Sequence, residues 1–184
     1  MGKADMTTQQ TGEIGGDRSA RRTSGGVSGG VAGIGQLPAF ELPDARGGTV
    51  RSWDYKSRRH LVLWLAGATP DQSALAAMAT REGAIQAEGA ALLVIVRASP
   101  DVARQIGSDS GLHGPILADG DGRVHARLDA GQPTLLVADR NGTIYWRAPD
   151  AGGRPDLDEA LSWLRYLNIL EPECGTCVPA WPVE

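Results

Sequence analysis

Cysteine is scarce in this sequence: there are two in 184 residues, Cys174 and Cys177, and both lie close to the C-terminus. Long apolar runs are also missing, since no stretch approaches ~20 apolar residues. The N-terminus lacks the apolar core of a secretion signal. We therefore expect no membrane span and a cytoplasmic location, where both cysteines begin as thiols.

Strongly basic stretches are missing as well. The formal net charge is −4, and no Lys/Arg stripe with interleaved aromatic residues occurs, so nucleic acid is not an expected partner. No phosphate-cradling glycine loop and no Ser/His/Asp order is present, and we expect no cofactor. A hydrophobic content of 41% in this length predicts one globular core with tails.

Residues 1–36 form a segment of biased composition. They contain ten of the 25 glycines and few larger aliphatic residues. Such a composition cannot bury enough apolar surface to form a core. We expect an N-terminal arm that is disordered or ordered by a protein partner.

Apolar runs and helical periodicity predict a βαβα order in the first half of the folded region. The run HLVLWLA has the length of a central strand covered on both faces. The expected elements, in chain order, are a strand at 60–66, a helix at 71–87, a strand at 91–98 and a helix at 100–106. This order requires parallel strands joined by right-handed crossovers.

The helix expected after the first strand is amphipathic in our interpretation. Leu75, Met78 and Ile85 form an apolar face, and Arg81 and Glu82 mark the other face. The apolar face is expected on the sheet and Glu82 in solvent.

The stretch QPTLLVADRNGTIYWR predicts a hairpin. Strands are expected at 135–138 and 143–147, and the Asn-Gly pair in the turn between them can adopt positive φ. Pro133 cannot donate to a ladder, so it belongs at a strand start, an edge or a bulge. The remaining expected elements are a hairpin at 37–55, a short strand at 115–119, a helical turn at 122–128 and a closing helix at 155–169.

Three separated segments resemble, in the same order, the redoxin group of the thioredoxin-like superfamily, which includes peroxiredoxin-like (AhpC/TSA-type) domains. They are LPAFELPDARGGTVRSWDY, HLVLWLA and PTLLVADRNGTIYW. The resemblance implies an α/β, thioredoxin-like three-layer fold with a central mixed β-sheet over residues 37–169. It also implies that Pro133 is cis and faces the redox site, beside Thr69. The C-terminal tail is then 170–184.

The family's catalytic cysteine is missing from its usual position. In this family it follows the first central strand at a helix N-terminus, where backbone N–H groups and the helix dipole stabilise a thiolate. Here the segment is GATPDQS. A thioredoxin-type CPxC alignment puts Thr69 and Gln72 at the cysteine positions, and a peroxiredoxin-type TPxC alignment puts Gln72 at the peroxidatic position. The arginine that peroxiredoxins carry at the start of the later strand is replaced by Pro133. We expect a degenerate family site at these three residues.

The only thiols are those of Cys174-Gly175-Thr176-Cys177, which have the spacing of a redox dithiol. They are our candidate catalytic residues, as a displaced pair that folds back towards the family site or acts as a shuttle. A zinc half-site shared with a partner or a second copy is an alternative, because zinc needs two further ligands. The third alternative is that the two cysteines have no chemical role. The motif Asp119-Gly120-Asp121-Gly122 is interpreted as an ordinary turn and not a calcium loop.

Two hypotheses for function follow. The first is a thiol-disulfide oxidoreductase or antioxidant-like protein in which the C-terminal dithiol replaces the lost site. The second is a non-catalytic thioredoxin-fold subunit that binds a larger protein complex through the N-terminal arm and the C-terminal tail. The TPDQ segment favours the second hypothesis, whereas the CxxC motif and Pro133 favour the first.

Overall fold

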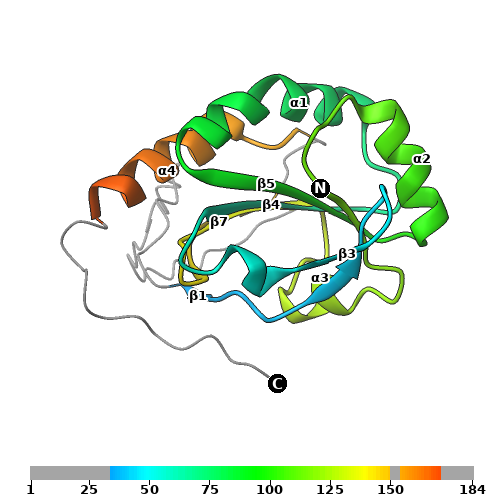
Figure 1. Cartoon of the computed structure of the whole chain (residues 1–184), viewed down its shortest axis with the longest axis horizontal. Coiled ribbons are helices and arrows are strands. Elements are labelled where there is room, and N and C mark those ends of the chain that lie inside the picture. The colour runs from blue at the N-terminus through cyan, green and yellow to red at the C-terminus, as the bar shows by residue number, and fades with distance from the viewer. Residues whose placement is uncertain (1–33, 150–153, 171–184) are drawn as a thin grey trace, which may run out of the picture.

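The computed structural model describes residues 34–149 and 154–170, drawn in colour in Figure 1. The strands are β1 Gly35–Gln36, β2 Glu41–Pro43, β3 Thr49–Arg51, β4 His60–Ala66, β5 Ala90–Val96, β6 Ile116–Ala118, β7 Thr134–Ala138 and β8 Thr143–Pro149. The helices are the 3₁₀ helix η1 Ser52–Tyr55 and the α-helices α1 Gln72–Ala87, α2 Pro100–Ser110, α3 Arg123–Arg127 and α4 Leu157–Leu170.

The central sheet is mixed, as the sequence predicts. Its strand order is β1-β8-β7-β4-β5-β6. Strands β4, β5 and β6 are parallel, and β7 is antiparallel to β4 and to β8. The α/β, thioredoxin-like fold class expected from the resemblance is confirmed. The short β2–β3 hairpin forms a separate two-stranded sheet.

Strand β4 is covered on both faces, because all seven of its residues are buried. Val62 and Trp64 pack into the core on one side of the sheet, and Leu61, Leu63 and Leu65 pack into the core on the other. This alternation follows from the period of two of a strand. The prediction of a doubly covered central strand at 60–66 is confirmed.

The two faces of the sheet carry different layers. Buried side chains of α1, α2 and α4 share the core that includes Trp64. The other core holds side chains of α3 and of the segment around the β2–β3 hairpin. Figure 1 shows α1, α2 and α4 on one side of the sheet and α3 and β3 on the other.

Several boundaries differ from the predictions. Strand β5 ends at Val96, since Ala98 N–H turns back to the Val96 carbonyl at 2.9 Å. Helix α2 continues to Ser110 and stops at Gly111, whose φ of 68° only glycine adopts readily. In addition, β1 joins the sheet through β8, two residues before the expected start of the domain. In the described ranges, no helix is both long and apolar enough to cross a membrane.

Glu82 is a correction to the sequence interpretation. It was expected on the solvent face of α1, but the residue is 3% exposed. Its carboxylate accepts hydrogen bonds from the backbone N–H of His113 at 2.8 Å and from Gln86 at 3.2 Å. These donors satisfy a charge that would otherwise be costly to bury. The connection after α2 covers this side chain, and helical periodicity within α1 carries no information about that connection.

Helices α1 and α4 run in the same direction. Arg81 and Asp158 form an ion pair at 2.9 Å near the middle of α1, and Glu88 and Arg165 form another at 3.0 Å beyond its end. Both partners advance by seven residues between the two pairs, so the helix axes are parallel. Helix α4 therefore ends beside the C-terminal end of α1, next to the start of β4.

Candidate functional site

The family site lies where β4 ends and β7 begins. Because these strands are antiparallel, Leu65 pairs with Thr134, and Pro133 comes to the carboxyl end of β4. A cavity of about 50 Å³ opens there. Its lining residues come from the ends of β4 and β5, from α3 and from the loop before β7, and they are Ala66, Gly67, Arg97, His125, Ala130, Gly131, Gln132 and Pro133.

Thr69, in the turn that leaves β4, and Gln72 lie outside this lining. Both residues are exposed. Gln72 is the first residue of α1, which is where the resemblance puts a catalytic cysteine. The structure thus brings Pro133 to the expected end of the sheet. The cis form of its peptide bond and its proximity to Thr69 stay predictions.

The N-terminus of α1 is capped by a carboxylate. Asp71 accepts a hydrogen bond from the backbone N–H of Ser73 at 3.2 Å, and the Ser73 hydroxyl donates to its other oxygen. The hydroxyl bond and then the N–H bond hold the pKa of Asp71 below its usual value. A negative charge already occupies the helix end at which a thiolate would be stabilised.

A buried acid and imidazole pair lies at the cavity, which His125 helps to line. Asp119 is 0% exposed and His125 is 3% exposed. Oδ2 of Asp119 lies 2.6 Å from Nδ1 of His125, and Nε2 of the same ring lies 2.8 Å from the carbonyl oxygen of Ala66. The pair therefore ties the β6–α3 loop to the last residue of β4.

Backbone donors hold Asp119 in place. The N–H groups of Val124 and His125 donate to its carboxylate at 3.3 and 3.0 Å. Burial raises the pKa of Asp119. The hydrogen bonds from His125 and from the two N–H groups together lower it by more than burial raises it, so the pKa lies below its usual value. The Asp119-Gly120-Asp121-Gly122 motif is thus a turn that begins α3, as the sequence predicts.

Two arginines stand near the cavity. Arg97 lines it from the end of β5. A neighbouring cavity of about 520 Å³ shares Gly131 and Gln132 with it and includes Arg147, whose guanidinium donates to the Asp129 carbonyl at 2.6 Å. The resemblance expects an arginine at the position of Pro133. In this structure Arg97, directly after β5, lines the cavity instead.

The candidate dithiol Cys174 and Cys177 lies outside the described residues. Among the residues that the structure describes, no group of three or more His, Cys, Asp and Glu side chains could hold a metal ion. The chemistry that the described site offers is thus hydrogen bonding and charge, from Arg97 and from the Asp119–His125 pair.

Sequence reasoning missed the Asp119–His125 pair. A signal was present: an aspartate follows a short apolar strand, and a histidine stands six residues later in the expected helical turn. That spacing lets one carboxylate accept both backbone N–H groups and the ring of the turn. The contact with Ala66 joins segments 59 residues apart in sequence, and nothing local indicates it.

Comparisons with solved structures agree with the fold. The peroxidoxin BcpB of Mycobacterium tuberculosis is 20% identical, with a TM-score of 0.64, and the match covers 74% of this chain and 98% of that one. AhpC of the same organism is 18% identical, with a TM-score of 0.65 and coverage of 75% and 93%. A putative thiol:disulfide interchange protein DsbE from Chlorobium tepidum is 19% identical, with a TM-score of 0.60 and coverage of 74% and 94%.

Sequence comparison gives the family. A search of curated proteins found no significant match. The family model described as AhpC/TSA family, however, matches residues 35–147, which is more than half of the chain. The matched range runs from β1 into β8 and contains the whole cavity lining described above. The chain therefore belongs to the AhpC/TSA family.

Proposed function

We propose that this protein exchanges thiols and disulfides through Cys174 and Cys177, and that its inherited family site no longer performs redox chemistry. The observation that carries the proposal is that a chain with a redoxin-family fold keeps both of its cysteines in one CxxC motif and none in the fold. Two residues between the cysteines allow the sulfurs to form a disulfide, and each thiol can stabilise the thiolate of the other. The substrate class is a protein disulfide or a hydroperoxide.

The chemistry of the inherited position supports this proposal. Gln72 has no ionisable group that could act as a nucleophile. The neighbouring Asp71 carboxylate accepts hydrogen bonds from the backbone N–H and the hydroxyl of Ser73. A negative charge at that helix end disfavours a second anion there. The carboxyl end of β4 can still contact a substrate through Pro133 and Arg97.

The direction of α4 favours a shuttle over a pair that folds back to the inherited site. Asn168 near the end of α4 lies 3.2 Å from His60, the first residue of β4. The seven residues of β4 span about 20 Å. The four residues from Leu170 to Cys174 span at most about 14 Å, so Cys174 of the same chain falls short of the carboxyl end of β4. Cys177, seven residues after Leu170, spans at most about 25 Å and reaches that end only if the segment is almost fully extended.

The test is a redox titration of the purified full-length protein. In dithiol buffers of graded potential, the Cys174–Cys177 pair should interconvert between dithiol and disulfide at a potential between about −270 and −120 mV. Wild type should reduce insulin disulfides or a hydroperoxide, and Cys174→Ser/Cys177→Ser should lose this activity. Gln72→Ala and Thr69→Ala are the matched controls and should keep it.

A loss of ~100-fold or more in either control would show that the inherited site still works, since that is the scale of an essential catalytic group. Wild-type protein without measurable reduction of either substrate would leave the second candidate function. If wild type bound one zinc ion per two chains and the double Ser variant did not, Cys174 and Cys177 would be ligands of a shared metal site. They would then be neither a redox pair nor cysteines without a chemical role.

The second candidate is a non-catalytic subunit that binds partner proteins. The observation that favours it is the exposed apolar surface of α4, where Tyr166 is 44% and Ile169 is 69% exposed. Trp163 packs edge-on against Tyr166 with ring centroids 5.6 Å apart, beside a hollow of about 240 Å³. In this function, deletion of residues 1–36 or 171–184 prevents assembly, whereas the double Ser variant still assembles.

A further inference from the structure

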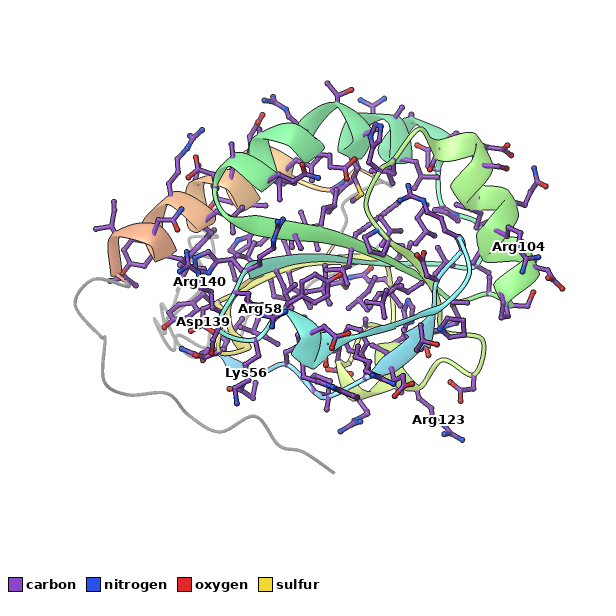
Figure 2. All side chains as sticks on the ribbon, viewed as in Figure 1. Lys56, Arg58, Arg104, Arg123, Asp139 and Arg140 are labelled. Carbon is purple, nitrogen blue, oxygen red and sulfur yellow. The ribbon has the colours of Figure 1, made fainter. Side chains whose placement is uncertain are left out.

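Basic side chains gather at the amino-terminal end of β4, opposite to the family site. They come from the loop before β4, from the β7–β8 turn and from α4, and we call them the amino-end basic cluster: Lys56, Arg58, Arg59, Arg140 and Arg165. Figure 2 shows Lys56, Arg58 and Arg140 on one side of the molecule, near the end of α4. Arg104 and Arg123 lie on the other side of the same view.

Backbone and side-chain contacts bring these segments together. The Ser57 N–H donates to the Arg140 carbonyl at 2.8 Å, which joins the loop before β4 to the β7–β8 turn. A Cβ atom added to Gly89 would lie 3.6 Å from Nη2 of Arg140, so that guanidinium reaches the end of α1. Burial, and then the charge of Arg140, lower the pKa of His60 to about 4. The positive charge of Arg140 is therefore felt at the first residue of β4.

Two nearby carboxylates, those of Glu88 and Asp139, are already engaged. Glu88 binds Arg165 at 3.0 Å and Asn168 at 3.2 Å. Asp139 accepts the backbone N–H groups of Asn141 and Thr143 at 2.9 and 2.7 Å inside its own turn. Arg58 and Arg59 are exposed. In the described ranges neither side chain has a carboxylate within ion-pair distance, so these two arginines present positive charge to solvent.

Helix α4 delivers the C-terminal segment to this cluster. Asn168 binds both His60, at 3.2 Å, and the Glu88 carbonyl, at 3.1 Å, two residues before α4 ends. Arg58 and Arg59 directly precede His60 in the chain. The first three residues after Leu170 reach up to about 10 Å, which is enough to lie over the loop before β4.

The C-terminal segment is acidic. Residues 171–184 include Glu171, Glu173 and Glu184 and contain no Lys, Arg or His. Two of these carboxylates stand within three residues of the end of α4, and Cys174 follows directly. Because α4 ends beside the cluster, only one to three residues tether these carboxylates to it, so pairing the opposite charges costs little chain entropy.

We propose that residues 171–184 dock on the amino-end basic cluster of the same chain, with Glu171 and Glu173 paired to its arginines. Docking puts Cys174 and Cys177 near guanidinium groups, which favour the thiolate form. This consequence for reactivity rests on the proposed function, whereas docking itself does not. The dithiol then works at the end of the sheet opposite to the family site.

Hydrogen exchange of the full-length protein, read by mass spectrometry on peptides from 171–184, tests the docking. Arg58→Gln/Arg59→Gln removes two exposed positive charges from the cluster. Arg104→Gln/Arg123→Gln removes the same charge from the other side of the molecule and is the matched control (Figure 2). We expect the first variant to exchange severalfold faster than wild type in this segment, and the control to match wild type. Raising the salt concentration should have the effect of the first variant, because salt screens exposed charges.

Charge-reversal variants test the pairing directly. Glu171→Lys/Glu173→Lys should lose the protection, and adding Arg58→Glu/Arg59→Glu to it should restore part of it. Equal exchange in wild type, in the cluster variant and in the control would overturn the proposal and leave an acidic partner protein as the occupant. Protection that falls on dilution would overturn it in favour of a second copy. Protection in a wild-type protein that has no measurable redox activity would contradict the proposed function and leave the docking intact. The exchange is also measured on Cys174→Ser/Cys177→Ser protein, where we expect the protection to persist because docking rests on the carboxylates and not on the thiols.

Discussion

Oδ2 of Asp119 lies 2.6 Å from Nδ1 of His125, and both side chains are buried. The other ring nitrogen of His125 faces a carbonyl oxygen, that of Ala66, at 2.8 Å. A carbonyl can only accept, so Nε2 carries a proton. Nδ1 of the same ring shares the short hydrogen bond with the Asp119 carboxyl group. Both ring nitrogens of this buried side chain are therefore hydrogen-bonded at the cavity.

Replacement of one member of this pair should destabilise the fold. Asp119→Asn replaces one carboxylate oxygen with an amide NH₂, so one of the buried donors that Asp119 accepts loses its acceptor. An orphaned buried donor costs about 1–3 kcal/mol. We expect a loss of this size in the free energy of unfolding, measured with urea at pH 7.

Asp121→Asn is the control for this variant. Asp121 belongs to the same turn, but it is exposed and pairs with exposed Arg123 at 2.9 Å. Surface pairs contribute about 1 kcal/mol or less. Equal losses in the two variants would show that the buried hydrogen bonds of Asp119 contribute no more to stability than an exposed pair.

The fold was predictable from patterns that are local in sequence. The run HLVLWLA gave the bounds of β4, and the proline, apolar strand and Asp-Arg-Asn-Gly order gave the β7–β8 hairpin. The turn holds because Asp139 accepts two backbone N–H groups and Gly142 has a φ of 83°. Each of these properties depends on neighbouring residues, which the sequence shows directly.

The site was predictable only in part. The position of Gln72 at the start of α1 and that of Pro133 at the start of β7 follow from the order of elements. The contacts of His125 with Ala66 and of Glu82 with His113 depend on how distant loops cross. No periodicity within α1 or α3 encodes those crossings, so both residues look like solvent-facing or scattered polar residues in the sequence.

The burial of Glu82 leads to a second prediction. Glu82→Ala removes the acceptor for the His113 N–H and leaves a cavity beside Gly114, where an added Cβ would lie 3.1 Å from the Glu82 carboxylate. An orphaned buried donor costs about 1–3 kcal/mol. Urea unfolding at pH 7 should show a loss in this range. Arg81→Ala, at the preceding residue, removes an ion pair in which both side chains are exposed, and it should cost about 1 kcal/mol or less. The reverse order of the two losses would contradict the buried position of Glu82.

The lowered pKa of His60 predicts that the protein loses stability as the pH falls. Burial is the main cause that lowers its pKa from 6.5 to about 4, the charge of Arg140 adds to it, and the hydrogen bond with Asn168 opposes it. Since the folded pKa lies below the unfolded one, the unfolded chain takes up this proton first. Stability is therefore complete above pH 6.5 and falls as pH drops towards 4, by up to about 3 kcal/mol for this group.

The measurement is the free energy of unfolding at several pH values between 7.5 and 4 for wild type and His60→Gln. Glutamine can still donate to Asn168 but does not titrate. Other groups change alike in both proteins, so the difference between the two curves isolates His60. Wild type should lose more stability than the variant as pH falls through this window. Parallel curves would mean that His60 is as easily protonated in the folded protein as in the unfolded chain.

The last prediction concerns the family site and the carboxylate that caps α1. Gln72→Cys, in the Cys174→Ser/Cys177→Ser protein, puts one thiol at the helix end where the resemblance expects it. Asp71 remains beside it as a negative charge and raises the thiol pKa. Adding Asp71→Asn keeps a good N-cap residue and removes the charge. A neighbouring negative charge disfavours the thiolate. Iodoacetamide should therefore alkylate the Asp71→Asn/Gln72→Cys protein faster at pH 7 than the Gln72→Cys protein. Equal rates would show that the Asp71 charge does not act on position 72, and the loss of redox chemistry there would then rest on the missing sulfur alone.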